Sequence, residues 1–282
     1  MERITFTTSC DKNFFPGTLA LVKSIRRFYN KDNANIYVLH TDLENESLKL
    51  LELYDVTAEK MLDCIDPRKQ GKAVATYWAL IKQEEKKVLH IDSDAWLLSR
   101  IDNVFEKLNE NSIIAWNDKM GHGIRHPKKY FKFSPPVDYD KEKYNFNAGI
   151  VGYGNGQNIK KLVNDFLNAC YDDEINFNCG NQGIIRSLVC KYDLENKINF
   201  IKGKDATHYN PIWREAEELE YDENKNRWIN MRTGKKQFIF HATGGKDRKI
   251  GKNKPWQSPE IWSESVIKCW DWINSYQLEE EK

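Results

Sequence analysis

The sequence predicts an α/β fold with a mostly parallel, twisted central sheet that is flanked by helices. Three observations support this prediction. Short apolar runs alternate with amphipathic helical patterns along the first part of the chain. An apolar strand then ends directly in Asp92 and Asp94, and open parallel sheets bind ligands at the carboxyl ends of their strands. No internal repeat or linker divides the 282 residues, so we expect a single domain.

The first half of the chain alternates regularly between predicted strands and helices. In the helical segment 18–29, Leu21, Val22 and Ile25 recur at the spacing of one helix face. Strands are predicted at 4–8, 36–40, 88–91 and 112–116, and helices at 18–29, 43–53, 73–85 and 101–108. A β-α-β-α beginning of this kind predicts parallel strands with helices on the faces of the sheet.

The second half is less regular. A loop is predicted at 117–144, a charged irregular segment at 202–237 with a turn at 232–234, and a Gly/Lys-rich loop after 241. Between them lie predicted strands at 146–153 and 238–241 and helices at 159–170 and 183–190. The chain ends in a predicted helix at 259–278. We interpret its apolar stripe as core packing, with a membrane-facing stripe as the alternative.

Composition and charge exclude several classes of protein. The net charge is +1, from 43 basic and 42 acidic side chains, so no strong field favours nucleic acid or an anionic membrane. The six cysteines lack CxxC spacing, which argues against zinc and favours buried thiols in a reducing compartment. Neither a signal-peptide pattern nor a bilayer-length apolar stretch is evident. The cytosol, or the face of a membrane, is the expected location.

The sharpest motif is the apolar strand VLHI at 88–91, which runs into Asp92-Ser93-Asp94. Two carboxylates at a strand end concentrate charge that Mg²⁺ or Mn²⁺ can neutralise, and such an ion can hold a diphosphate. One alternative is a pair of exposed aspartates in a turn. Another is a haloacid-dehalogenase-type phosphatase, but the AWL that follows in mid-chain does not fit its pattern. His90, within the strand, is interpreted as a packed or hydrogen-bonded core histidine.

Five sequence blocks occur in a characteristic order. They are DKNFFPGTLALVKSI (11–25), IYVLH (36–40) with an acidic helix after it, VLHIDSDAWLLSRIDNVF (88–105), FNAGIVGYG (146–154), and FIFHATGG (238–245) with a later KPW (254–256). In this order they resemble glycosyltransferase family 8, which includes glycogenin and the bacterial lipopolysaccharide galactosyltransferases. The resemblance spans nearly the whole chain.

The resemblance implies a GT-A fold, a UDP-sugar donor, Mn²⁺ (or Mg²⁺) and transfer with retention of anomeric configuration. Carried over by position, the metal ligands are Asp92, Asp94 and His241. The implied contacts to base and ribose are Ser9, Asp11, Asn13 and Phe14; those to the donor sugar are Asn147, Ala148, Asn181 and Gln182; and those to the diphosphate are Gly244 with either Lys246 or Lys254. Ser93 is a further candidate donor contact. Gln182, with Asn181 beside it, is the catalytic candidate.

The chain also departs from the family pattern. Asn181 stands where the family has an aspartate, and an amide carries no charge and is not a base. Extra residues separate His241 from the Lys-Pro-Trp block, so Lys246 and Lys254 compete for one role. The segment 73–81, where the family carries an Arg or Lys that reaches the donor, contains neither.

Three functions therefore remain open from the sequence. The first is a retaining glycosyltransferase that moves a hexose from a UDP-sugar to a saccharide, glycolipid or protein hydroxyl. It would proceed by front-face attack or through a covalent intermediate. The donor half is expected at 1–116 and the acceptor side at 117–282. The second is a nucleotide-sugar-binding protein without turnover, and the third is a phosphatase or nucleotidyltransferase. The sugar, the acceptor and the oligomeric state stay open.

Overall fold

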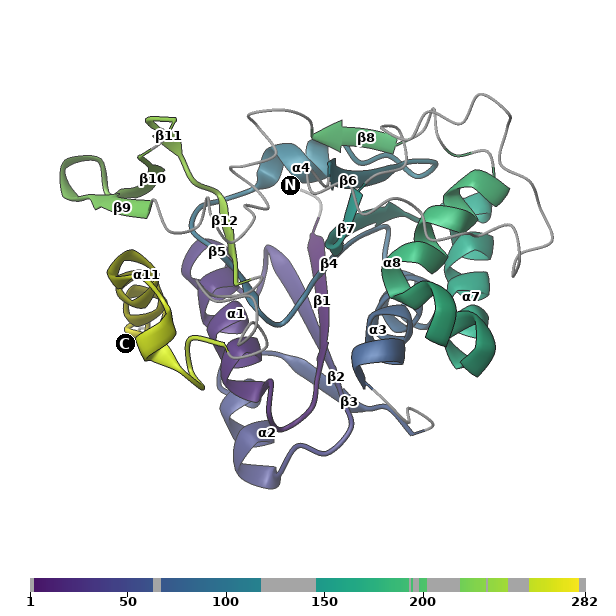
Figure 1. Ribbon diagram of the computed structural model, residues 1–282, viewed down its shortest axis with the longest axis horizontal. Helices are drawn as coiled ribbons and strands as arrows, with labels where there is room; N and C mark the ends of the chain where they lie inside the picture. The colour runs from purple at the N-terminus through teal and green to yellow at the C-terminus, as the bar shows by residue number, and fades with distance from the viewer. Residues whose placement is uncertain are drawn as a thin grey trace.

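A seven-stranded sheet lies at the centre of the molecule (Figure 1). The computed structural model describes residues 3–62, 67–117, 146–192, 194, 198–201, 219–231, 233–242 and 254–278. The strand order is β3-β2-β1-β4-β7-β6-β8. The strands are β1 (Ile4–Cys10), β2 (Ala34–His40), β3 (Thr57–Lys60), β4 (Lys87–Ile91), β6 (Ile113–Asn117), β7 (Phe146–Gly154) and β8 (Ile198–Ile201).

The sheet is mostly parallel, as the sequence predicts. The pairs β3–β2, β2–β1, β1–β4 and β6–β8 are parallel, and β7 runs antiparallel to both of its neighbours, β4 and β6. The sequence did not reveal β3 or β8 as strands. Because β3 reads Thr-Ala-Glu-Lys and lies at the sheet edge, it lacks the apolar run that marks a central strand.

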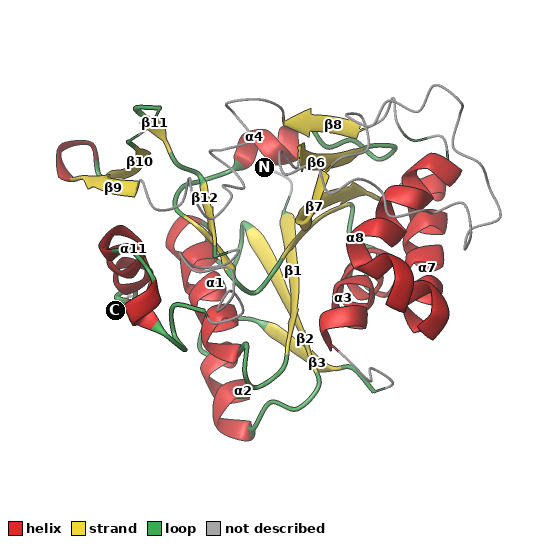
Figure 2. Ribbon diagram, in the orientation of Figure 1, coloured by secondary structure: helices red, strands yellow, loops and turns green. Residues whose placement is uncertain are grey.

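Helices cover both faces of the sheet (Figure 2). On one side lie α1 (Phe15–Phe28), α2 (Asn45–Glu52) and the C-terminal α11 (Glu264–Asn274). On the other lie α3 (Lys72–Tyr77), α7 (Gln157–Tyr171) and α8 (Asp173–Lys191). Two π-helical turns, η1 (Pro67–Gly71) and η2 (Trp78–Lys82), extend α3 at its ends, and α4 (Asp102–Glu106) is a single short helix.

Alternating side chains of the central strands build two separate cores. Leu89 and Ile150 face the core formed with α1 and α11, whereas Val88 and Val151 face the one formed with α7 and α8. This is the period of two that a β-strand imposes when both faces are covered. Cys10, Cys170 and Cys269 carry buried thiols, as expected for structural cysteines.

The C-terminal helix is shorter than the sequence predicts. A 3-10 turn, η5 (Pro259–Ile261), precedes it, and extended backbone at Trp262 and Ser263 separates the two. The apolar stripe packs inward, with Val266, Cys269 and Ile273 buried, which confirms the core interpretation. In the described part of the chain, no helix is long and apolar enough to span a membrane.

A small antiparallel sheet replaces part of the segment predicted to be irregular at 202–237. It consists of β9 (Leu219–Asp222), β10 (Arg227–Asn230) and β11 (Lys235–Lys236), with the turn η4 (Glu223–Lys225) between the first two strands. The expected turn before β11 is present, and Gly234 adopts φ +65° there, a conformation that glycine takes without strain. The strands are too short and charged to show a clear alternation in the sequence.

A two-stranded ribbon joins distant parts of the chain. β5 (Ala95–Leu97), which immediately follows the two aspartates, pairs antiparallel with β12 (Ile239–His241). Trp96 and Phe240, opposite each other in this ribbon, are fully buried and stack at 5.3 Å between ring centroids. The pairing therefore fixes the end of β12 beside the end of β4.

We expect Phe240→Ala to lower the free energy of unfolding by about 3–5 kcal/mol, because it removes a fully buried ring from this ribbon. Phe238→Ala, at a partly buried position of the same segment, serves as the matched control and should destabilise less. Urea denaturation of the three proteins measures the difference. Equal losses for both variants would show that the stacked pair is not the anchor of the ribbon.

Candidate active site

The two aspartates occupy a tight turn at the carboxyl end of β4. The backbone N–H of Asp92 donates to the Gly149 carbonyl of β7 at 2.7 Å, and the N–H of Ala95 donates back to the Asp92 carbonyl at 2.9 Å. The turn between two buried strands leaves Asp92 partly exposed and Asp94 nearly buried, with side-chain exposures of 32% and 13%. Both carboxylates thus lie at the edge where open sheets bind ligands.

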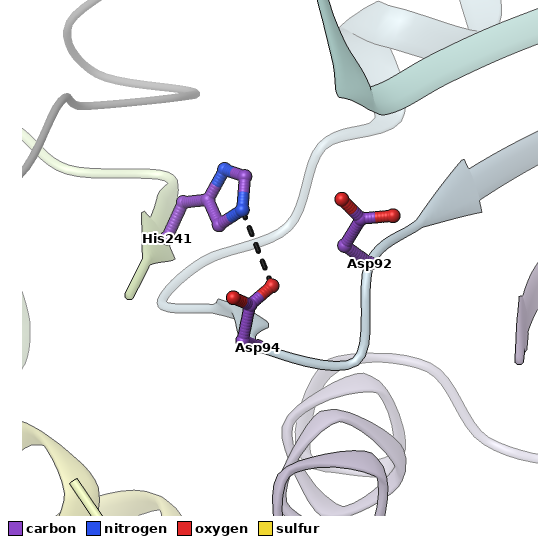
Figure 3. A group of neighbouring side chains, drawn as sticks. All are labelled: Asp92, Asp94 and His241. Atoms are coloured by element: carbon purple, nitrogen blue, oxygen red, sulfur yellow. Dashed lines mark ion pairs between the residues drawn. The ribbon is translucent and has the colours of Figure 1, made fainter. Parts of the chain in front are cut away.

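His241 reaches this turn through the pairing of β12 with β5. The register places His241 opposite Ala95, and the next residue, Ala242, donates its N–H to the Asp94 carbonyl at 2.8 Å. The His241 Nε2 atom lies 3.2 Å from Asp94 Oδ1, and Asp92 points toward the same space (Figure 3). Ligand atoms of Asp92, Asp94 and His241 all lie within 4.8 Å of one another.

These three side chains fit a hard divalent cation. Two carboxylate oxygens and one imidazole nitrogen are a donor set that Mn²⁺ accepts. The packing leaves space for them: a Cβ at Gly149 would lie 2.5 Å from the His241 ring and 2.9 Å from Asp92 Oδ2. The missing side chain at position 149 therefore allows His241 and Asp92 to converge over β7.

Each aspartate also contacts one lysine. Lys72, the first residue of α3, lies 3.0 Å from Asp92 Oδ1 and 3.3 Å from Oδ2, and also donates to the Ala148 carbonyl at 2.5 Å. Lys254 pairs with Asp94 Oδ2 and donates to the Ala242 carbonyl at 2.8 Å. Two ammonium groups therefore balance the charges of the two carboxylates.

Neighbouring lysines and hydrogen-bonding histidines set the ionisation of the aspartates. Burial raises the pKa of Asp92, but Lys72 and His90 outweigh it and hold that pKa below its usual value. At Asp94 burial also raises the pKa, but Lys254 and His241 together outweigh it and hold that pKa far below its usual value. Both side chains are therefore carboxylates at neutral pH, the form that binds a cation.

His90 supports Asp92 from within β4. Its Nε2 lies 3.1 Å from Asp92 Oδ1, and burial lowers the pKa of the ring, so the neutral ring donates from Nε2. Its Nδ1 is buried without a hydrogen-bond partner in the described structure. The sequence interpretation of a buried, hydrogen-bonded histidine is confirmed, and its partner is the first aspartate of the motif.

A cleft of about 210 Å³ opens beside the three clustered side chains. It brings together predicted residues from both halves of the chain: Ser9, Asp11, Phe14, Asp92, Ser93, Asp94, Asn181 and Lys254. Cys10 and Lys72 complete its lining. Burial raises the pKa of Cys10 to about 12, so this residue lines the cleft as a thiol and not as a nucleophilic thiolate.

Several other predicted residues are not among the described residues that line this cleft. Asn147 accepts the Gly149 N–H at 2.7 Å, and Gln182 accepts the Ala148 N–H through its side-chain oxygen at 3.0 Å. Asn13 is not among the residues that line the cleft; its carbonyl accepts from Trp256 Nε1 at 3.2 Å. Gly244 and Lys246 lie outside the described residues.

The KPW block is anchored to the start of α1. Besides its bond to Asn13, Trp256 packs edge-on against Phe14 with ring centroids 6.2 Å apart. A Cβ at Gly17 would lie 2.4 Å from the Trp256 ring and 2.5 Å from the Ser93 carbonyl. This close packing brings Lys254 to Asp94, while the diphosphate contact for which Lys254 competes with Lys246 stays a prediction.

Lys72 is a charged cleft residue that the sequence did not predict. The family resemblance predicts an Arg or Lys within 73–81. The helix α3 begins earlier, and its Lys72 lies one residue before that segment. Because lysine side chains are usually exposed, the residue type did not indicate that Lys72 would be buried. Thr76 Oγ1 donates to the Lys72 carbonyl at 2.9 Å one turn along the same helix, but this contact is visible only in the structure.

Comparison with solved structures identifies the fold. The galactosyltransferase LgtC, solved with donor and acceptor sugar analogues, matches 99% of this chain at TM-score 0.59 and 13% identity. The match covers 98% of the LgtC chain. The glycosyltransferase GlyE of Streptococcus pneumoniae TIGR4 matches 98% of this chain at TM-score 0.62 and 18% identity. The bifunctional glycosyltransferase WbbM matches 97% of it at TM-score 0.65 and 14% identity.

These likenesses establish a GT-A glycosyltransferase fold and confirm the resemblance at that level. The chain spans 62% of the matched GlyE chain and 50% of the matched WbbM chain. No protein-family model matches the chain, and no curated protein matches it.

We expect Gly149→Ala to weaken Mn²⁺ binding at least about tenfold, because the new methyl group must displace His241 or Asp92. Gly152→Ala, on the same strand, is the matched control: its Cβ would meet Ile114 at 2.4 Å, away from the candidate ligands. It should lower stability but leave the Mn²⁺ affinity of the folded protein unchanged. Isothermal titration of both variants at a temperature where they are folded measures this, and equal Mn²⁺ affinities would contradict the proposed ligand set.

Proposed function

We propose that this protein is a retaining, metal-dependent glycosyltransferase that moves a hexose from a UDP-sugar to a hydroxyl of a saccharide, glycolipid or protein. The observation that carries the proposal is the convergence of Asp92, Asp94 and His241 beside a cleft in a GT-A fold. Polar residues and cations suited to a nucleotide diphosphate line the same cleft. Mn²⁺ is the proposed ion, and Mg²⁺ is the alternative.

The N-terminal wall of the cleft suits the nucleoside. Asp11 Oδ1 accepts the backbone N–H groups of Asn13 and Phe14, both at 2.9 Å, which holds the turn that leads into α1. This turn keeps the Asp11 carboxylate and the Phe14 ring at the cleft, where a ring can stack on a base and a carboxylate can accept ribose hydroxyls. Ser9 and Ser93 add hydroxyl groups nearby.

The metal-binding wall suits the diphosphate. A bound divalent ion supplies Lewis-acid stabilisation of the charge on a departing diphosphate. Lys72 and Lys254 flank the same aspartates and carry donors for phosphate oxygens. They are buried enough for their charges to be poorly screened, since each side chain is 11% exposed.

The end of β7 suits the transferred sugar. The Ala148 N–H donates to the side-chain oxygen of Gln182, and the Ala148 carbonyl accepts from Lys72. We assign Gln182 to the region of the anomeric carbon, where its amide dipole can stabilise positive charge that develops as the leaving group departs. Asn181 lines the cleft next to it and can hydrogen-bond sugar hydroxyls.

The proposal predicts that the protein releases UDP from a UDP-hexose in the presence of Mn²⁺. Asp94→Asn should lower that rate at least about 100-fold, because even residues that only support metal ligands are worth 10–100-fold. Asp102→Asn is the matched control, since Asp102 pairs with Arg100 at 2.7 Å, outside the cleft. A coupled UDP assay with UDP-glucose, UDP-galactose and their N-acetyl forms measures the rates. Equal rates in the two variants would exclude metal-dependent transfer at this site.

A nucleotide-sugar-binding protein without turnover is the second candidate, and the neutral Asn181 in the cleft favours it. The discriminating variant is Asn181→Asp, which restores the carboxylate. UDP binding without turnover in both proteins would support the binding role. Phosphate release from p-nitrophenyl phosphate would instead support the phosphatase reading of the same acidic pair.

A further inference from the structure

The two carboxylates of the candidate metal site already have cationic partners within the chain. Lys72 and Lys254 come from different parts of the sequence, and each donates to one aspartate and to one backbone carbonyl, Ala148 or Ala242. An ammonium group has three donors, and the described contacts of Lys254 account for two. The arrangement balances two negative charges with two positive charges.

We propose that Lys72 and Lys254 act as internal counter-cations that oppose binding of a bare divalent ion and favour its binding together with a diphosphate. This inference rests on the proposed function, because the diphosphate is that of the proposed nucleotide-sugar donor. The two lysines thereby control whether the ion binds alone or together with the nucleotide. The chemical species the site selects is therefore the ion–nucleotide pair.

The physical reason is Coulomb repulsion in a confined space. A divalent ion held by Asp92 and Asp94 must approach ammonium groups that lie on the same carboxylates. Because both lysine side chains are nearly buried, solvent screens this repulsion poorly. When the ion binds without an anion, the cluster carries excess positive charge, or the lysines are forced away from their partners.

A diphosphate removes this conflict. Its oxygens offer the ammonium groups new acceptors, and its negative charge compensates for the added ion. Ion and diphosphate then each bind more tightly in the presence of the other, and linkage requires the two enhancements to be equal. A diphosphate that bridges the ion directly produces coupling as well, so coupling in the wild-type protein is not by itself diagnostic.

The diagnostic quantity is the affinity for the bare ion. If the lysines only contact the diphosphate, their removal weakens UDP binding and leaves the Mn²⁺ affinity unchanged. If they are counter-cations, their removal strengthens Mn²⁺ binding in the absence of any nucleotide. The two accounts therefore predict different results for one measurement.

The experiment measures free Mn²⁺ by electron paramagnetic resonance in titrations of the full chain, with and without UDP. Lys254→Met and Lys72→Met keep an unbranched side chain, one atom shorter, and remove its charge. Lys268→Met is the matched control, because Lys268 is exposed and pairs with Glu264 at 2.7 Å on α11. Circular dichroism melting confirms that each variant is folded.

We expect Lys254→Met to bind bare Mn²⁺ about tenfold more tightly than wild type, within the 5–150-fold range of ordinary coupling energies. The ratio of Mn²⁺ dissociation constants without and with UDP should fall by a comparable factor. Lys72→Met should shift both quantities in the same direction, and Lys268→Met should leave them at the wild-type values.

Unchanged or weaker binding of bare Mn²⁺ in both cleft variants would overturn the inference. That result is independent of the proposed function, because this arm contains no nucleotide. Absence of UDP binding to the wild-type protein with Mn²⁺ would instead count against the proposed donor site. Tighter Mn²⁺ binding by Lys268→Met to the same extent would also overturn the inference, since the effect would then reflect net charge alone.

Discussion

The candidate site depends on the pairing of β12 with β5. This ribbon is the only described contact that places an imidazole from near the end of the chain against the aspartates at the end of β4. Its register is fixed by the backbone bond from Ala242 to Asp94 and by the stacked rings of Trp96 and Phe240. A slip by one residue would turn His241 to the opposite face. The buried aromatic pair therefore does more than fill the core, because it sets the position of a candidate metal ligand.

A layer of aromatic rings extends this anchoring to the other parts of the cleft. Trp270 of α11 contacts Trp96 at 5.0 Å and stacks on Trp256 at 5.4 Å between ring centroids. Trp256 in turn holds the start of α1, through Phe14 and the Asn13 carbonyl, and lies two residues after Lys254. Rings of this size bury large areas and have few rotamers, so they position neighbouring backbone with little freedom. The C-terminal helix thereby supports the N-terminal wall of the cleft and the Lys254 side chain together.

The sequence predicted the parts of this architecture that have strong local signals. The apolar runs of β1, β2, β4 and β7 and the amphipathic α1 and α7 were found because burial on defined faces imposes a period. β5 was missed because three residues after a turn carry no periodicity, and its partner β12 is distant in sequence. Lys72 was missed for a related reason: its position in the cleft arises from how α3 packs against β1, and no local pattern of residues encodes that packing. The ligand trio was accessible only through a family resemblance, since the spacing between Asp94 and His241 carries no information about their contact.

The balance of charges also gives a physical context for Asn181. The cleft holds Asp11 in addition to the two lysine-paired aspartates, so another carboxylate would add negative charge where, under the proposed function, a diphosphate binds. An amide at position 181 avoids that repulsion and can still donate and accept hydrogen bonds. Under the proposed function, stabilisation of the anomeric centre then falls to dipoles such as the Gln182 carbonyl, which is already oriented by the Ala148 N–H. A preoriented dipole is weaker than a charge, but it requires less desolvation and no counter-ion of its own. Under the proposed function, an amide at position 181 therefore transfers stabilisation of the anomeric centre from a charged group to the side-chain dipole of Gln182, which Ala148 of β7 orients.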